Sequence, residues 1–169
     1  MSPSFTIRQL TADDATAYRE LRLAGLKGDP RAFTAAWEDE IDYPLEVHRS
    51  RITDNYVLGG FLDGGKLCGV AGLMVPKGAK VRHRGTLWGV YVTPDARGLG
   101  LAAALVSGVV EKARTVVEVL TLGVGTYNVS AQRVYLAAGF VEHAREAGLI
   151  KIGDEYVDEI LMSISFRDH

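Results

Sequence analysis

The residues best placed for chemistry form a glycine-bearing turn between an apolar strand and a long helix. Arg97, Gly98 and Gly100 lie in this turn, a few residues after Val90-Tyr91-Val92. A helix start leaves about four backbone N–H groups without intrahelical partners and carries about half a positive charge, a natural site for phosphate. Glycines let a ligand approach the main chain closely, and Arg97 adds a cation. The spacing predicts a diphosphate site, with a simple tight turn and a solvated arginine as the alternative.

Two other phosphate motifs can be tested against this segment, and neither fits it. Gly98-x-Gly100-x-x-Ala103 satisfies a relaxed dinucleotide fingerprint, and Glu118 follows Gly98 by about twenty residues. In a dinucleotide fold, however, the glycines follow the strand immediately and the acid closes the second strand. Here residues 93–97 separate strand and glycine, and Glu118 precedes the next apolar run. The chain has no Gly-Lys-Ser/Thr sequence, which removes the ordinary nucleoside-triphosphate loop.

Two motifs about thirty residues apart resemble those of the GNAT superfamily of N-acetyltransferases. Arg97, Gly100 and Ala102 match its acetyl-CoA motif, Arg/Gln-x-x-Gly-x-Gly/Ala, in register. Residues 128–140 match Asn-x-x-Ala-x-x-x-Tyr-x-x-x-Gly-Phe position for position. The order of predicted elements resembles the same family over nearly the whole chain. The resemblance implies an acetyl-CoA-dependent N-acetyltransferase.

The resemblance also implies residues that bind acetyl-CoA and a proton donor. The cofactor-binding set comprises Val90, Tyr91, Val92, Arg97, Gly98, Leu99, Gly100, Leu101, Ala102, Asn128 and Tyr135. Main-chain groups of residues 90–92 are expected to pair with the pantetheine arm in the manner of an added strand. Asn128 either touches this arm or only caps a helix, and it can do both. Tyr135 is expected to protonate the departing CoA sulfur, with a core aromatic as the alternative.

The acceptor side is less defined by the sequence. Glu38, Asp39 and Glu40 lie in the segment that forms one wall of the acceptor site in this family, and Glu40 is the preferred candidate for a general base. Glu38, Phe33 and Trp37 are candidates for substrate contact, although acids are usually solvated and aromatic residues also pack helices against sheets. Many family members carry an acid in the strand before the phosphate turn. Leu87-Trp88-Gly89 offers none, which leaves a built-in base in doubt.

The predicted elements alternate in a way that would position these residues. We expect strands over residues 5–10, 56–62, 66–75, 86–92 and 119–124, one beginning at residue 140, and a last one near 156–166. Helices are expected after a capping box at residues 11–14, over 45–51, through residue 113 and over 128–138. The central helix is expected to bury Leu99, Ala103, Val106, Val110 and Ala113.

The fold class is therefore α/β of mixed type. The expected GNAT fold has a mostly antiparallel, twisted sheet of six to seven strands and about four helices on both faces. By resemblance, the strands ending at Val92 and starting at Val119 splay apart to admit the cofactor. The final strand alternates Ile160, Met162, Ile164 and Phe166, and this apolar face suggests a possible homodimer.

Composition bounds the remaining choices. The 169 residues suit a single domain spanning residues 1–169, and 19 basic against 21 acidic residues give no footprint for nucleic acid. We expect no membrane span and no signal peptide, hence a cytoplasmic protein. The four histidines lack metal-like spacing, so no metal is implied, and Cys68 is expected to be a core residue rather than a reactive thiol.

The expected reaction is transfer of an acetyl group from acetyl-CoA to a primary amine by direct attack in a ternary complex. The acceptor would be a small-molecule or peptide amine, and neither composition nor motif chooses between them. A non-catalytic acyl-CoA-binding sensor with the same fold is the alternative, favoured by the missing acid at residues 87–89.

Overall fold

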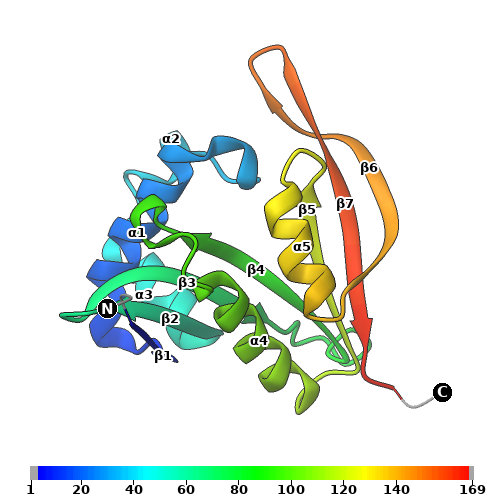
Figure 1. The fold of residues 1–169 in the computed structure, drawn as a ribbon, viewed down its shortest axis with the longest axis horizontal. Coiled ribbons are helices and arrows are strands. Elements are labelled where there is room, and N and C mark those ends of the chain that lie inside the picture. Colours follow the sequence, from blue (N-terminus) through cyan, green and yellow to red (C-terminus); the bar gives the residue numbers. More distant parts are fainter. Residues whose placement is uncertain (1–3, 168–169) are drawn as a thin grey trace.

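The computed structural model describes residues 4–167, which form one seven-stranded sheet covered by helices on both faces (Figure 1). The strands are β1 (Phe5–Gln9), β2 (Tyr56–Leu62), β3 (Lys66–Met74), β4 (Arg84–Val92), β5 (Val119–Gly125), β6 (Val141–Ile152) and β7 (Glu155–Ser165). The α-helices are α1 (Ala15–Gly28), α2 (Trp37–Glu40), α3 (Leu45–Asp54), α4 (Leu101–Arg114) and α5 (Val129–Ala137). Short 3₁₀ turns are η1 (Ala12–Asp14), η2 (Pro30–Ala32) and η3 (Pro94–Ala96). The predicted fold class and order of elements are confirmed.

The sheet order is β1-β2-β3-β4-β5-β7-β6, and every neighbouring pair is antiparallel except β4 and β5. These two parallel strands pair only through Arg84↔Val119, Gly85↔Leu120 and Thr86↔Thr121. Beyond Thr86 they separate, which leaves a V-shaped opening in the middle of the sheet (Figure 1). The predicted splay between the strand ending at Val92 and the one starting at Val119 is present.

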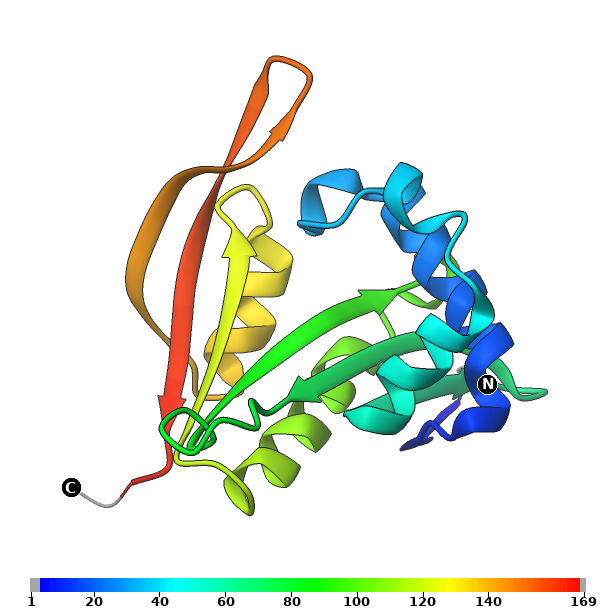
Figure 2. The same ribbon diagram turned by 180° about the vertical axis from the view of Figure 1, so that it is seen from behind.

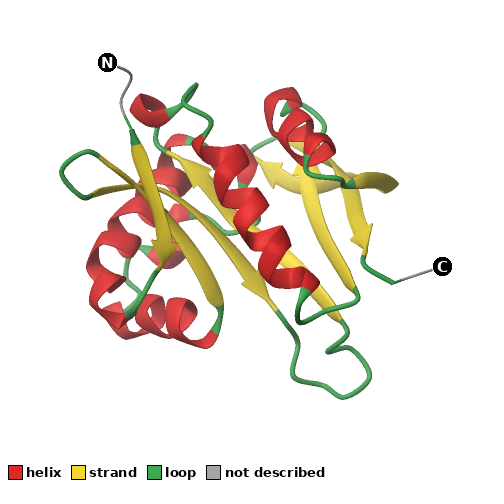
Figure 3. Cartoon of the chain, turned by 60° about the horizontal axis from the view of Figure 1, so that its bottom comes forward, coloured by secondary structure: helices red, strands yellow, loops and turns green. Residues whose placement is uncertain are grey.

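Helices α4 and α5 lie on one face, and α1 and α3 lie on the other (Figures 1 and 2). Strands β2 and β3 are buried on both sides, because alternate side chains belong to two cores. Leu58 and Cys68 pack beneath α4, whereas Val57 and Val70 pack beneath α1 and α3. Figure 3 shows this sandwich of helices around the sheet. No helix among residues 4–167 is long and apolar enough to span a membrane.

Two expectations need correction. The central helix begins at Leu101 and buries Leu101, Leu105, Val106, Val109, Val110 and Ala113. Leu99 precedes it and Ala103 is exposed, because Gly98 and Gly100 both adopt positive φ and delay the first helical turn.

The final strand, β7, has β5 on one edge and β6 on the other, so its edges are not free for another subunit. Ile160 and Met162 on its apolar face are buried in the core of this chain.

Candidate active site

A cavity of about 460 Å³ occupies the opening between β4 and β5. From the face that carries α4 and α5, it is lined by Ala103, Ala131, Val134 and Tyr135. From the opposite side, it is lined by Asp29, Arg31, Ala32 and Thr34 of the segment after α1, and by Tyr127 and Glu159. The cavity therefore reaches both faces of the sheet through the gap between the strands.

A bulge in β4 lies at the edge of this cavity. Val70 pairs with Tyr91 and Gly72 pairs with Trp88, so Ala71 alone faces both Gly89 and Val90. Gly89 has φ +65°, the left-handed conformation typical of a glycine bulge. Because β5 has already diverged, the free edge of β4 from residue 87 onward has no strand partner. Its main-chain groups are available to a ligand that extends along the strand.

The turn predicted to bind the diphosphate contains two glycines of positive φ. Gly98 and Gly100 have φ +78° and +83°, and a Cβ at either position would meet no atom within 4 Å. The turn thus presents open space above the first amides of α4, a 14-residue helix whose N-terminus carries positive partial charge. Arg97 donates from Nε to the carbonyl of Val92 at 3.1 Å, which fixes the turn against the end of β4.

Most of the predicted cofactor-binding residues line the cavity. These are Val90, Tyr91, Val92, Arg97, Gly98, Gly100, Leu101, Ala102, Asn128 and Tyr135. Leu99 is the exception, since it is half-buried and does not line the cavity. Asn128 caps α5, since its Oδ1 accepts from the Ala131 amide at 3.2 Å. Its amide nitrogen is left over for a ligand.

Tyr135 projects from α5 and is only 7% exposed. Its ring packs against Phe140 in an edge-to-face contact with 5.9 Å between centroids. Burial raises the pKa of the phenol to about 12, so the hydroxyl stays protonated throughout the physiological range. A protonated hydroxyl at the rim of a cavity can donate a hydrogen bond to charge that develops there.

Glu40, the residue predicted as the general base, belongs to a buried cluster of charged side chains. Glu40 is buried, and its two carboxylate oxygens accept hydrogen bonds from Arg22 and Arg51 at 3.0–3.1 Å. Burial alone would raise the pKa of Glu40, but the two guanidinium groups outweigh it and lower the pKa to about 2. A carboxylate held this way is a poor proton acceptor at neutral pH and does not line the cavity. The hypothesis that Glu40 is the general base is therefore not supported by the geometry.

The other predicted substrate contacts also lie outside the cavity lining. Phe33 is buried between the Arg22 guanidinium, 5.3 Å from its ring, and the Tyr91 ring, whose centroid is 6.2 Å away. Trp37 lies beneath the Lys27 ammonium at 4.9 Å, and Glu38 is exposed. Phe33 and Trp37 hold α1, α2 and the turn η2 together, and η2 supplies part of the cavity wall.

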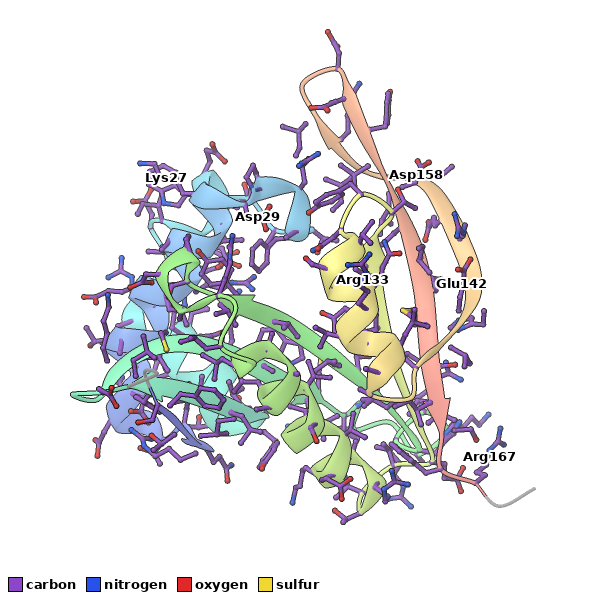
Figure 4. The ribbon with its side chains drawn as sticks, viewed as in Figure 1. Lys27, Asp29, Arg133, Glu142, Asp158 and Arg167 are labelled. Atoms are coloured by element: carbon purple, nitrogen blue, oxygen red, sulfur yellow. The ribbon has the colours of Figure 1, made fainter. Side chains whose placement is uncertain are left out.

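The half of the cavity away from α4 and α5 (the acceptor half) contains five polar residues that were not among the predicted site residues: Asp29, Arg31, Thr34, Tyr127 and Glu159. The Arg31 guanidinium lies 4.1 Å from the centre of the Tyr127 ring, which joins η2 to the β5–α5 turn across the opening. Figure 4 shows Asp29 and Asp158, the neighbour of Glu159 in β7, on opposite sides of this opening. The sequence Gly123-Val124-Gly125 could have indicated this part of the cavity. Glycines at alternate positions leave one face of a strand without side chains, so that side chains from other elements can pack there.

Comparison with known proteins agrees with this geometry. Residues 18–140 match the model of the acetyltransferase (GNAT) family, and the chain belongs to that family. As a member of it, the chain uses acetyl-CoA as its acyl donor. No curated protein matches the chain in sequence.

Several solved structures share the fold. A GNAT-family acetyltransferase from Streptococcus pneumoniae is 23% identical, with TM-score 0.84 over 96% of this chain and 99% of that one. The protein yncA from Salmonella typhimurium, solved with its cofactor acetyl-CoA, is 21% identical, with TM-score 0.81 over 98% of this chain and 96% of that one. Ribosomal-protein-alanine N-acetyltransferase from Brucella melitensis is 22% identical, with TM-score 0.77 over 95% and 99%.

Proposed function

We propose that this acetyltransferase acts on nitrogen, moving the acetyl group to a primary amine that attacks directly in a ternary complex. The observation that carries the proposal is the cavity that opens on both faces of the sheet between β4 and β5. The coenzyme-binding turn and Tyr135 lie on one side, and an acceptor-sized space lined by polar groups lies on the other. Both reactants can therefore be held at once, as direct transfer requires.

The residues around the cavity fit acetyl-CoA. The amides at the start of α4 and the space above Gly98 and Gly100 suit the diphosphate. The free edge of β4 suits the pantetheine amides, and an N–H near the bulge at Val90 would polarise the thioester carbonyl. When bound, acetyl-CoA supplies the electrophilic carbonyl and the thiolate leaving group. Tyr135 would donate its phenolic hydrogen toward the departing sulfur.

Direct attack is also supported by the position of Cys68. This is the sole cysteine of the chain, and transfer through an acylated cysteine would need it at the cavity. Cys68 is fully buried beneath α4, its thiol donates to the Gly60 carbonyl at 3.3 Å, and burial raises its pKa. A thiol in this environment is not a nucleophile.

Replacing Tyr135 by phenylalanine tests the proposed function. We expect Tyr135→Phe to lower kcat for amine-dependent CoA release by about 100-fold, because general acid catalysis contributes roughly that much or more. Its affinity for acetyl-CoA, measured by calorimetry, should stay within about twofold, since only one oxygen is removed from a packed ring.

Tyr156→Phe is the matched control, because Tyr156 is 62% exposed and does not line the cavity. This variant should match the wild type in both measurements. If wild-type protein binds acetyl-CoA but no amine in a broad panel releases CoA, the non-catalytic acyl-CoA sensor becomes the better description. An unchanged kcat in Tyr135→Phe would remove the proton-donor role and leave the transferase intact.

A further inference from the structure

Glu159 is a half-buried carboxylate, and its Oε2 atom has an unfilled hydrogen-bonding capacity inside the cavity. It lies on β7 opposite Gly125 of β5, and its Oε1 occupies the space where a Cβ of Gly123 would be. Its Oε2 is shielded from solvent and has no hydrogen-bond partner among residues 4–167. The absence of a side chain at Gly123 is what allows the carboxylate to lie there.

A second unsatisfied polar atom shares the same cavity. The Tyr127 hydroxyl is buried and also lacks a partner within the described chain. Buried polar groups without hydrogen bonds are costly, so two of them in one cavity indicate a polar ligand. A carboxylate and a phenol oxygen together accept hydrogen bonds, and an ammonium ion supplies three donors and a positive charge.

The charged groups around Glu159 come from three other elements. Glu146 of β6 is its direct cross-strand partner, and Tyr127, Asp29 and Arg31 line the cavity with it from the β5–α5 turn and the segment after α1. Burial raises the pKa of Glu159, and the negative charge of Glu146 raises it further. Arg31 lies over the Tyr127 ring and does not offset these two effects, so a positively charged ligand would be favoured beside the Glu159 carboxylate.

Glu159 and Tyr135 approach the opening from opposite sides of the sheet. Along β5, Leu120, Leu122 and Val124 face the core beneath α4 and α5, to which Tyr135 belongs. Gly123 and Gly125 alternate with them and face the other way, toward Glu159 and Tyr127. A nucleophile that arrives from the Glu159 side and a thiolate that leaves toward Tyr135 would lie on opposite sides of the reacting carbon.

We propose that Glu159 receives the acceptor as an ammonium ion and removes one proton from it, so that the substrate class is a primary amine that is protonated at neutral pH. This inference rests on the proposed function. The nitrogen forms a bond to the acetyl carbon as the carbon–sulfur bond breaks. One proton of the ammonium ion goes to the Glu159 carboxylate. The departing sulfur gains a proton from the Tyr135 hydroxyl. The nitrogen loses a second proton as the amide forms, and this proton restores the Tyr135 hydroxyl.

The pH dependence of Glu159→Gln distinguishes a base from a merely structural residue. In wild type, kcat/KM should be level between the pKa of Glu159 and the pKa of the amine, because the charged carboxylate and the ammonium ion are the reacting forms. In Glu159→Gln only the free amine can react, so kcat/KM should rise tenfold per pH unit up to the amine pKa. The loss should be about 100-fold or more at pH 7 and should narrow as pH rises.

Three further variants sharpen the test. Gly123→Ala keeps the charge but displaces the carboxylate, because its Cβ would collide with Glu159 Oε1; we expect at least a tenfold loss of kcat/KM. Glu159→Asp, which keeps a shorter carboxylate, should retain the level wild-type profile at reduced rate. Glu155→Gln alters an exposed acid of the same strand outside the cavity and should match the wild type.

Binding provides a readout that does not depend on turnover. The primary amine that wild type acetylates fastest, titrated calorimetrically into protein saturated with CoA, should bind at least tenfold more weakly to Glu159→Gln. Affinity for acetyl-CoA itself should be unchanged. A wild-type pH profile and wild-type amine affinity in Glu159→Gln would overturn this inference and leave the transferase standing. Wild-type protein that acetylates no amine would overturn the proposed function and this inference together.

Discussion

At the scale of single residues, two carboxylates of this chain show how surroundings decide what an acid can do. Two arginines hold Glu40, and its pKa is lowered to about 2, whereas Glu159 has no hydrogen-bond partner for Oε2 and its pKa is raised. Both are glutamates at least partly removed from water. The first is committed to stability, and the second is poised to accept a proton.

Glu40 should therefore control stability rather than catalysis. Its pKa is lower in the folded chain than in the unfolded one, so its stabilisation is complete above about pH 4.5 and is lost as pH falls toward 2. We expect Glu40→Gln to reduce the free energy of unfolding by about 3 kcal/mol at pH 7, because two buried or half-buried arginines lose their partner. Urea unfolding at pH 7 and pH 3 measures both effects, and the difference in the free energy of unfolding between the variant and wild type should be smaller at pH 3 than at pH 7.

The exposed neighbour Glu38 provides the control for this prediction. Glu38→Gln should change the free energy of unfolding by less than about 0.5 kcal/mol, as is usual for surface substitutions. A Glu40→Gln variant of normal stability that fails to acetylate amines would instead return Glu40 to the catalytic machinery.

At the scale of elements, the turn before α4 combines two requirements that fall on the same glycine. Gly100 is the N-cap of α4 and has φ +83°, a conformation that costs other residues about 1–2 kcal/mol. A Cβ there would also project into the space proposed for the diphosphate, since no protein atom lies within 4 Å. Strain and ligand exclusion can therefore be separated by comparison with another glycine of similar conformation.

Gly64, in the turn between β2 and β3, provides that comparison, because it has φ +87° and equally open surroundings. We expect Gly100→Ala and Gly64→Ala each to lower the free energy of unfolding by about 1 kcal/mol. Only Gly100→Ala should also weaken acetyl-CoA binding, by about tenfold in calorimetry. Equal acetyl-CoA affinities in the two variants would argue against a diphosphate at the start of α4.

At the scale of the whole molecule, the sheet consists of two parts joined by three residue pairs between β4 and β5. A ligand lying in the gap would contact β4 and α4 on one side and β5 and α5 on the other. Binding of acetyl-CoA should therefore stabilise the contact between the two parts of the sheet. We expect acetyl-CoA at 100 times its Kd to stabilise the protein by about 2.7 kcal/mol, which raises Tm by roughly 5–10 °C.

Hydrogen exchange can locate this effect. Amides of residues 87–92 on the free edge of β4 should gain the most protection when acetyl-CoA binds, whereas the β2–β3 hairpin should change little. Protection confined to the hairpin, or spread evenly over the sheet, would place the coenzyme elsewhere.

The two sides of the cavity differ in how well the sequence predicts them. The residues proposed to bind the donor occur in two contiguous motifs whose glycines, asparagine and tyrosine have fixed spacing, and all of them except Leu99 line the cavity. The acceptor half brings together Asp29, Arg31, Tyr127 and Glu159 from segments as much as 130 residues apart in the chain. No local pattern marks such a set. Glu40 was misassigned because the sequence does not reveal that Arg22 and Arg51 flank it.

The opening of the cavity on both faces of the sheet also bears on how new specificities could arise. In the proposed function the donor lies on the α4 and α5 side, and the acceptor space lies on the other side, which is lined by residues of η2, the β5–α5 turn and β7. Substitutions in the second set change the acceptor without touching the coenzyme site. Under the proposed function, acceptor preference can therefore be redesigned on one face alone.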